Sequence, residues 1–281
     1  MGRLAQTLGV TNTHMRTSDD LTKLVNQSGF PMQLKIDALV NDQTDRLGWK
    51  VLYREHGWTH PNGQSGFIDL VLEDRHGTSV LIVECKRVLD ADWVFLDSTP
   101  PSPLTRRTRL WAVNTAGHGR QFSGYFDTRS APESHESMYC VVAGQDSKAR
   151  PMLERIAAEV TSATEALVIE EHAAITKRNY GLRMYASVIV TTAQLHLSRF
   201  DAQDVSTKTG EAKVVSHEAL PWIRFRKQLS SQFAMEPKNT DWDFAELALA
   251  KEKQVLIVNL EALPTFLEKW EVASNSLRAL M

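Results

Sequence analysis

Two acidic side chains and one lysine have a spacing that suits cation-dependent chemistry. Asp69 lies within the apolar run GFIDLVL, and Glu84 and Lys86 lie at the end of the apolar run VLIVECK. Side chains alternate along a strand, so Glu84 and Lys86 are predicted to share one face of theirs. Charged groups at the ends of apolar strands are costly to bury unless they pair or bind a cation. Carboxylates of this kind suit Mg²⁺, which also takes water and substrate phosphate as ligands.

The surroundings of the Glu84 triplet distinguish it from similar triplets that start at Asp146, Glu211 and Glu236. Residues 66–73 and 78–87 form two β-rich runs joined by the turn sequence EDRHG, which predicts a hairpin. Asp69 and Glu84 then lie near its open end. Alternation predicts one face with Phe67, Asp69 and Val71, opposite Ile68, Leu70 and Leu72. The competing interpretation is an ordinary salt-bridged sheet edge.

A helix, a strand and then FIDLVLEDRHGTSVLIVECKR resemble the core of the PD-(D/E)XK nucleases, the restriction-endonuclease-like superfamily. The resemblance covers residues 30–144. It implies that Asp69 and Glu84 are catalytic metal ligands, that the backbone carbonyl of Cys85 also binds the metal, and that Lys86 orients or activates the attacking water. It implies Mg²⁺ as cofactor, with Mn²⁺ expected to substitute. The reaction would be phosphodiester hydrolysis in nucleic acid, with DNA favoured over RNA.

The first predicted helix departs from the family pattern. Members often add a Glu from this helix, and no Glu occurs between residues 29 and 49. Gln33 and Asp37 are the available polar positions, one turn apart on a single face. Gln33 is slightly favoured as the additional catalytic position, since it lies nearer the helix start and could bind through its amide carbonyl.

A basic segment follows the hairpin and is a candidate for nucleic-acid binding. Residues 103–130 hold five Arg and one Asp, a local charge of +4, with aromatic residues interleaved. Basic side chains position phosphates and aromatic rings can stack on unpaired bases. Gln121 and Tyr125 also resemble a Gln-x-x-x-Tyr element that follows the lysine in RecB-like members, although a capped helix turn would have the same letters. The candidate contacts are Arg106, Arg107, Arg109, Gln121 and Tyr125, and the competing interpretation is a solvated loop.

Strands and helices interleave along the chain, which predicts an α/β or α+β fold with a mixed central sheet flanked by helices. A helix is expected over residues 30–47, with an apolar stripe of Leu34, Ile36, Leu39, Val40 and Leu47, and another from Pro151. Residues 97–119 are rich in Pro and are predicted to be a loop. Residues 222–227 alternate apolar and basic residues as an edge strand would. Residues 185–200 are expected to form a long strand or a hairpin, and the C-terminal helix is expected to include residues 267–280.

Composition limits the remaining possibilities. The 281 residues include 42% hydrophobic and 23% charged residues, an ordinary globular mixture. Net charge is −2, so any contact with nucleic acid must come from a local patch. Two cysteines are too few for a disulfide scaffold, which favours a cytoplasmic protein, and no apolar run approaches a membrane span. No membrane partner is expected.

Three segments are expected: an N-terminal arm over residues 1–28, a nuclease core over 29–145 and an α/β extension over 146–281. The last two could also form one continuous domain, because no sharp linker separates them. We expect a metal-dependent nuclease, acting in defence or DNA repair, with a homodimer or a partner protein as further options. The alternative is an inactive nuclease-fold protein that binds nucleic acid or serves as a scaffold.

Overall fold

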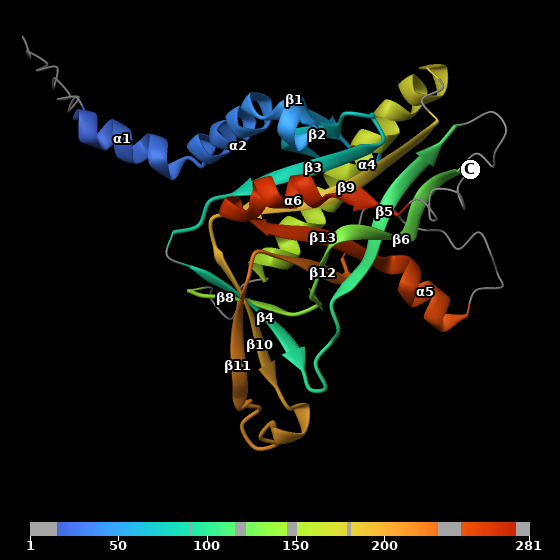
Figure 1. Cartoon of the computed structure of the whole chain (residues 1–281). Helices are drawn as coiled ribbons and strands as arrows, with labels where there is room; N and C mark the ends of the chain where they lie inside the picture. Colours follow the sequence, from blue (N-terminus) through green and yellow to red (C-terminus); the bar gives the residue numbers. More distant parts are fainter. Residues whose placement is uncertain are drawn as a thin grey trace, which may run out of the picture.

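A ten-stranded mixed sheet and a separate four-stranded sheet organise the protein (Figure 1). The structure is a computed structural model and describes residues 16–89, 91–115, 122–144, 151–178, 181–229 and 243–273. The predicted mixed α/β class is confirmed. Within the part of the chain that is described, no helix is long and apolar enough to cross a bilayer.

The large sheet joins segments from both halves of the sequence. Its strands run in the order β1 (Trp49–Thr59), β2 (Ser65–Asp74), β3 (Ser79–Lys86), β9 (Leu182–Thr191), β13 (Glu252–Asn259), β12 (Trp222–Gln228) and β7 (Glu136–Ser137). Strands β1, β2 and β3 form an antiparallel meander, and β9 lies beside β3 in parallel. Three further strands branch from β9: β5 (Thr105–Asn114), β6 (Phe122–Ser134) and β14 (Glu271–Val272).

The two faces of the large sheet have different covers. One face packs against α4 (Met152–Arg178) and the small sheet, whose strands are β11 (Val214–Leu220), β10 (Gln194–Phe200), β4 (Asp92–Ser98) and β8 (Cys140–Val142). The other face packs against α2 (Phe30–Asp42), α3 (Thr44–Leu47) and α6 (Leu263–Lys269). Helix α4 is the connection between the two parallel strands β3 and β9, after the intervening strands β4 to β8. The parallel strands are therefore buried on both sides.

Helix α2 buries Met32, Ile36 and Val40, which recur every four residues and form one row on its surface. Gly29 precedes it with φ +81°, and a Pro follows in the first turn. The prediction that Leu34 belongs to the buried stripe is wrong, because this side chain is 66% exposed. The helix is turned so that Gln33, not Leu34, faces the sheet, and Gln33 is 9% exposed.

The predicted loop over residues 97–119 is wrong for most of its length. Residues 105–114 form β5, which pairs with both β6 and β9. Within residues 97–115, only the Pro-rich stretch 99–104 and Thr115 lie outside β4 and β5. Cross-strand pairing stabilises the Arg-dense half of the segment, and this pairing comes from residues distant in sequence.

The predicted edge strand at residues 222–227 is also wrong. Strand β12 pairs with β13 on one side and with β7 on the other. Arg224 is 1% exposed and donates to the hydroxyls of Ser134, Thr108 and Ser130 and to the Ser130 carbonyl. These neutral acceptors bind both terminal nitrogens of the buried guanidinium, while its Nε has no hydrogen-bond partner among the described residues. Burial lowers the pKa of Arg224 to about 10.

Residues 185–200 and the C-terminal segment also differ from the secondary structure that the sequence predicts. Residues 185–200 are neither one strand nor a hairpin, because β9 belongs to the large sheet and β10 to the small one. The predicted C-terminal helix stops at Lys269, where β14 follows after Trp270. The rest of that predicted helix, from residue 274, lies outside the described residues, as do residues 1–15 of the predicted N-terminal arm.

The remaining helices lie at the periphery. Helix α1 (Ser18–Gln27) begins with a capping box between Thr17 and Asp20 and buries none of its residues. In Figure 1 it extends beyond α2, away from the sheets. This helix makes up most of the described part of the predicted N-terminal arm, and it does not lie on the body of the protein. Helix α5 (Phe244–Lys251) precedes β13, and two 3₁₀ turns cover Ala202–Asp204 and Leu260–Ala262.

Gly48→Ala is expected to destabilise the fold by about 1 kcal/mol, because Gly48 ends α3 with φ +73° and l-residues disfavour this conformation. An added Cβ would also lie 2.7 Å from Nη2 of Arg75, which must move. Urea denaturation measures the change. The control is Gly124→Ala, where an added Cβ makes ordinary contact at 3.4 Å. Equal stability of the two variants would contradict the role of the Gly48 conformation.

Candidate active site

The predicted hairpin is confirmed and places Asp69 and Glu84 at its open end. Strands β2 and β3 pair antiparallel, and Leu70–Val83 is the last registered pair toward that end. Asp69 and Glu84 are the next residues on their strands after this pair. The backbone N–H of Cys85 donates to Oδ2 of Asp69 at 2.6 Å, so the Asp69 side chain continues the connection between the strands. This bond fixes one carboxylate oxygen beside Glu84.

The predicted distribution of β2 side chains between the two faces of the sheet is wrong near Asp69, because β1 and β2 are irregular there. Ile68 and Val71 both pack in the core beneath α4, although alternation over three residues should place them on opposite faces. Glu55 lies opposite Asp69, between the registered pairs Arg54–Leu70 and His56–Ile68, and has φ +45°. A positive φ at a residue other than Gly is uncommon, and such conformations gather at functional sites. The regular alternation predicted for this stretch therefore breaks next to Asp69.

Helix α2 contacts β2 at the candidate site through Gln33. Its Nε2 donates to the backbone carbonyl of Asp69 at 3.0 Å. Asp37 instead forms two hydrogen bonds with the Arg54 guanidinium, each 2.8 Å long. The prediction that Gln33 or Asp37 lies against Asp69 is confirmed for Gln33. Its amide supports the position of Asp69, and a part in metal binding or catalysis stays a prediction.

Both carboxyl groups are in an environment that disfavours their charge. Burial is the main cause that raises the pKa of Glu84 to about 7, and repulsion from Asp69 adds to it. Burial also raises the pKa of Asp69, and the charge of Glu55 acts in the same direction, while the Cys85 N–H opposes it. Lys86 is near enough that its charge offsets part of the rise at both groups. Two partly buried acids that repel each other can be relieved by a proton or by a cation.

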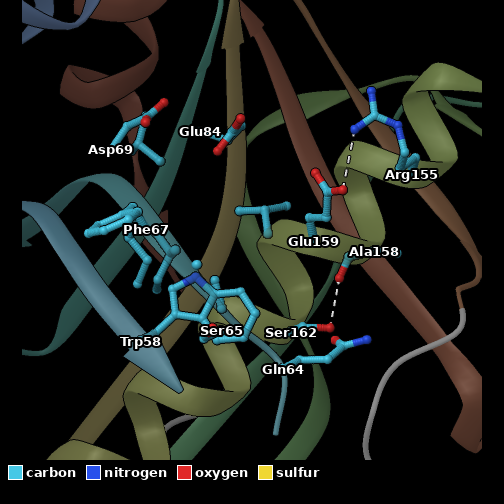
Figure 2. Close-up of a pocket in the computed structure, with 16 residues that line it drawn as sticks. Trp58, Gln64, Ser65, Phe67, Asp69, Glu84, Arg155, Ala158, Glu159 and Ser162 are labelled. Carbon is cyan, nitrogen blue, oxygen red and sulfur yellow. Dashed lines mark hydrogen bonds and ion pairs between the residues drawn. The ribbon is translucent and has the colours of Figure 1, made fainter. Parts of the chain in front are cut away.

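The carboxylates line a pocket of about 570 Å³ between the β1–β2 hairpin and α4 (Figure 2). Trp58, Gln64, Ser65 and Phe67 form the hairpin side, and α4 provides the opposite wall with Arg155, Ala158, Glu159 and Ser162. Arg155 and Glu159 form an exposed i,i+4 ion pair of 3.3 Å. Charges from both reach Glu84. The pocket therefore combines acidic side chains with an exposed cationic one.

Glu84→Gln is expected to change how stability depends on pH in the presence of a chelator. The pKa of Glu84 rises from 4.5 to about 7 on folding, so its contribution to stability is complete below pH 4.5 and disappears as pH increases through about 7. The wild-type chain should therefore lose stability relative to Glu84→Gln over this range. Urea denaturation at a series of pH values tests this, with the exposed Glu211→Gln as control. A pH-independent difference between wild type and Glu84→Gln would contradict the environment described for Glu84.

The arginines predicted to bind nucleic acid lie elsewhere. The expectation that they reach the cleft of Glu84 and Lys86 is not met: Arg106 and Arg107 line a different hollow, which shares no lining residue with the first. Strand β9 separates β3 from β5, and the Arg107 carbonyl accepts from Gln254 of β13. Asp127 pairs with Arg109 at 2.8 Å and with Arg107 at 3.6 Å, and Glu133 pairs with Arg106 at 3.7 Å. Much of the predicted local positive charge is thus neutralised, and phosphate binding by these arginines stays a prediction.

The other two candidate contacts have separate outcomes. Gln121 lies outside the described residues. Tyr125 donates its hydroxyl to Glu165 Oε1 at 3.0 Å, and its ring lies 3.8 Å from the Lys253 ammonium and against Trp111. These contacts place Tyr125 in an internal network between β6, β13 and α4, an arrangement that does not favour stacking on a base.

Sequence reasoning missed the α4 wall and the strained residue opposite Asp69. The i,i+4 spacing of Arg155 and Glu159 is visible in the sequence, but nothing there indicates that this helix surface faces Glu84. The positive φ of Glu55 has no sequence signal, because neither Gly nor Asn occupies the position. Alternation does place Phe67 on the face of Asp69, but it does not indicate that the Phe67 ring is exposed.

The candidate site has few side chains that could bind a metal ion. Among the residues that the structure describes, no group of three or more His, Cys, Asp or Glu side chains could hold a metal ion. The candidate ligands are therefore the carboxylates of Asp69 and Glu84 and the backbone carbonyl of Cys85. Comparison with known proteins adds no assignment, since no family model, curated protein or solved structure matches this chain.

Proposed function

We propose that the protein is a Mg²⁺-dependent nuclease of the restriction-endonuclease-like fold that hydrolyses phosphodiester bonds at Asp69, Glu84 and Lys86. The observation that carries the proposal is the junction of Asp69 and Glu84 at the open end of one hairpin, inside a pocket where both carboxyl groups have raised pKa values. The mixed central sheet with helices on both faces supports the fold assignment.

The residues present fit Mg²⁺ by the chemistry of their donors. Mg²⁺ prefers oxygen ligands and is commonly held by one or two carboxylates, with substrate phosphate and water in the other positions. Two side-chain carboxylates and a carbonyl are sufficient for such a site. Because the Cys85 N–H engages Oδ2 of Asp69, the cation would be held through the other oxygen, Oδ1. The mutual repulsion of Asp69 and Glu84 would then become an attraction shared with the cation.

Each protein group has a defined part in this proposal. Mg²⁺, when bound, supplies positive charge that polarises a phosphoryl oxygen and offsets charge on the leaving oxygen. Asp69 and Glu84 hold the cation, and the Lys86 ammonium orients the attacking water and stabilises negative charge that develops on the phosphoryl group. Gln33 holds the β2 backbone at Asp69 in place. Arg155 is near enough to the pocket to contact a substrate phosphate.

A second function is an inactive scaffold or nucleic-acid-binding protein that keeps this fold. The small number of side-chain ligands in the described part of the chain favours this alternative. Calorimetric titration of Mg²⁺ and Mn²⁺ into wild type and Asp69→Asn separates the two functions. The nuclease proposal expects binding that Asp69→Asn removes, whereas the scaffold expects no difference between the two chains.

The activity itself is tested by incubating the protein with end-labelled single-stranded and duplex DNA and RNA. We expect cleavage of at least one substrate in Mg²⁺ or Mn²⁺ and none in EDTA. Absence of cleavage of all four substrates in both metals would contradict the proposed function. Cleavage that persists in EDTA would contradict its metal dependence.

A further inference from the structure

Phe67 is an exposed aromatic side chain at the margin of the candidate active site. Its relative exposure is 69%, although it lies on a strand whose neighbours Ile68 and Leu70 are buried. It lines the same pocket as Asp69 and Glu84 (Figure 2). A large apolar ring left in water forgoes the free energy of burial, and this one lies beside a charged site.

The ring has one covered side. Phe67 pairs with Gly57 across the β1–β2 ladder, and a Cβ placed on Gly57 would lie 3.6 Å from Cε1 of Phe67. The ring therefore lies against a position that has no side chain. One explanation is that the phenyl ring shields the Gly57 backbone, as cross-strand aromatic residues do for glycine. The exposure of 69% shows that this contact leaves most of the side chain available.

The position of Phe67 relative to the carboxylates suits one nucleotide. Two residues along a strand span about 7 Å, so the Phe67 backbone is that far from the Asp69 backbone. A nucleobase is separated from its own phosphate only by the sugar. A nucleotide whose phosphate lies at Asp69 and Glu84 can therefore bring its base to Phe67. The pocket of about 570 Å³ is within the range of small-ligand sites, and Gln64 and Ser65 provide polar groups along its edge.

We propose that Phe67 is a stacking platform for an unpaired nucleobase, so that the substrate of this site is single-stranded nucleic acid. The inference rests on the proposed function, because it takes the phosphate position from Asp69 and Glu84. Bases within a duplex have their faces covered by their neighbours, whereas a single strand offers its base faces to aromatic side chains. Either DNA or RNA has the required chemistry, and separate arms of the experiment distinguish them.

The experiment measures binding of fluorescent single-stranded and duplex oligonucleotides, in DNA and RNA forms, by anisotropy in Mg²⁺. All chains carry Lys86→Ala to slow cleavage. Stacking on one aromatic ring contributes about 1–3 kcal/mol, so adding Phe67→Ala should weaken single-strand binding roughly 5- to 150-fold. Phe67→Trp should retain it. Phe244→Ala is the matched control, since Phe244 is 92% exposed on α5, and it should not change binding.

Thermal unfolding of each variant establishes that it folds. Equal single-strand affinity of a folded Phe67→Ala chain would overturn the stacking role and leave Phe67 as a shield for Gly57. Duplex binding as tight as single-strand binding in the Lys86→Ala chain would overturn the substrate class. If that chain binds neither form, the proposed function fails together with this inference. Cleavage by the wild-type chain, together with single-strand binding that Phe67→Ala leaves unchanged, would overturn the inference alone.

Discussion

Asp69→Asn, Glu84→Gln and Lys86→Ala are each expected to lower metal-dependent cleavage by about three orders of magnitude or more, and any two together should cost little beyond one. The reason is that two ligands of one cation and the adjacent ammonium act as a unit, and groups that act as a unit are strongly non-additive. Initial rates of oligonucleotide cleavage at saturating Mg²⁺ provide the measurement.

The matched control for these variants is Asp37→Asn, which makes the same chemical change on α2. Asp37 pairs with Arg54 and not with β2 at Asp69, so this variant should keep its cleavage rate. Robust cleavage by Lys86→Ala would remove the assigned role of the lysine. Multiplicative losses in the double variants would show that the three groups act separately.

Arg183→Met is expected to destabilise the protein by about 3–5 kcal/mol, because it leaves the buried Glu171 carboxylate without its cation and removes one of the two cations that pair with Glu73. Arg183 is 5% exposed at its side chain and lies 2.5 Å from Glu73 and 3.1 Å from Glu171, each 10% exposed. Burial alone would raise the pKa of Glu73. Hydrogen bonds from Lys50 and Arg183 outweigh the effect of burial, so the pKa of Glu73 is lowered. Urea denaturation at neutral pH measures the loss.

Two further variants define the origin of that loss. Arg46→Met removes an exposed partner of Glu268 and should cost less than about 1 kcal/mol. Adding Glu171→Gln to Arg183→Met should recover part of the stability, because one uncompensated charge is removed. An Arg183→Met chain as stable as Arg46→Met would contradict the view that this buried cluster locks β2 and β9 to α4.

The central part of the candidate site could be predicted because its determinants are local in sequence. Asp69 and Glu84 lie on adjacent strands joined by a short turn, so the hairpin alone brings them together. Gln33 and Asp37 could be selected together because both lie near the helix face that must pack on the sheet. Each of these inferences depends on alternation, helical period or turn chemistry, which short segments carry.

The rest depends on contacts between distant segments. Residues 105–114 pair with β6 and β9, and no local pattern indicates that Asp127 will neutralise the arginines of this strand. Arg224 can be buried because three hydroxyl groups from β5 and β6 accept its hydrogen bonds, while its sequence surroundings suggest an edge strand. The break in alternation beside Asp69 arises from the backbone of Glu55, which residue type does not reveal.

The most direct test of the central claim, that Asp69 and Glu84 hold a divalent cation together, is an anomalous-scattering measurement on crystals soaked in Mn²⁺. We expect an anomalous difference peak between the two carboxylates, close to the Cys85 carbonyl, and no such peak in crystals of Asp69→Asn. An ordered wild-type crystal with Mn²⁺ bound elsewhere, and no peak between Asp69 and Glu84, would contradict it.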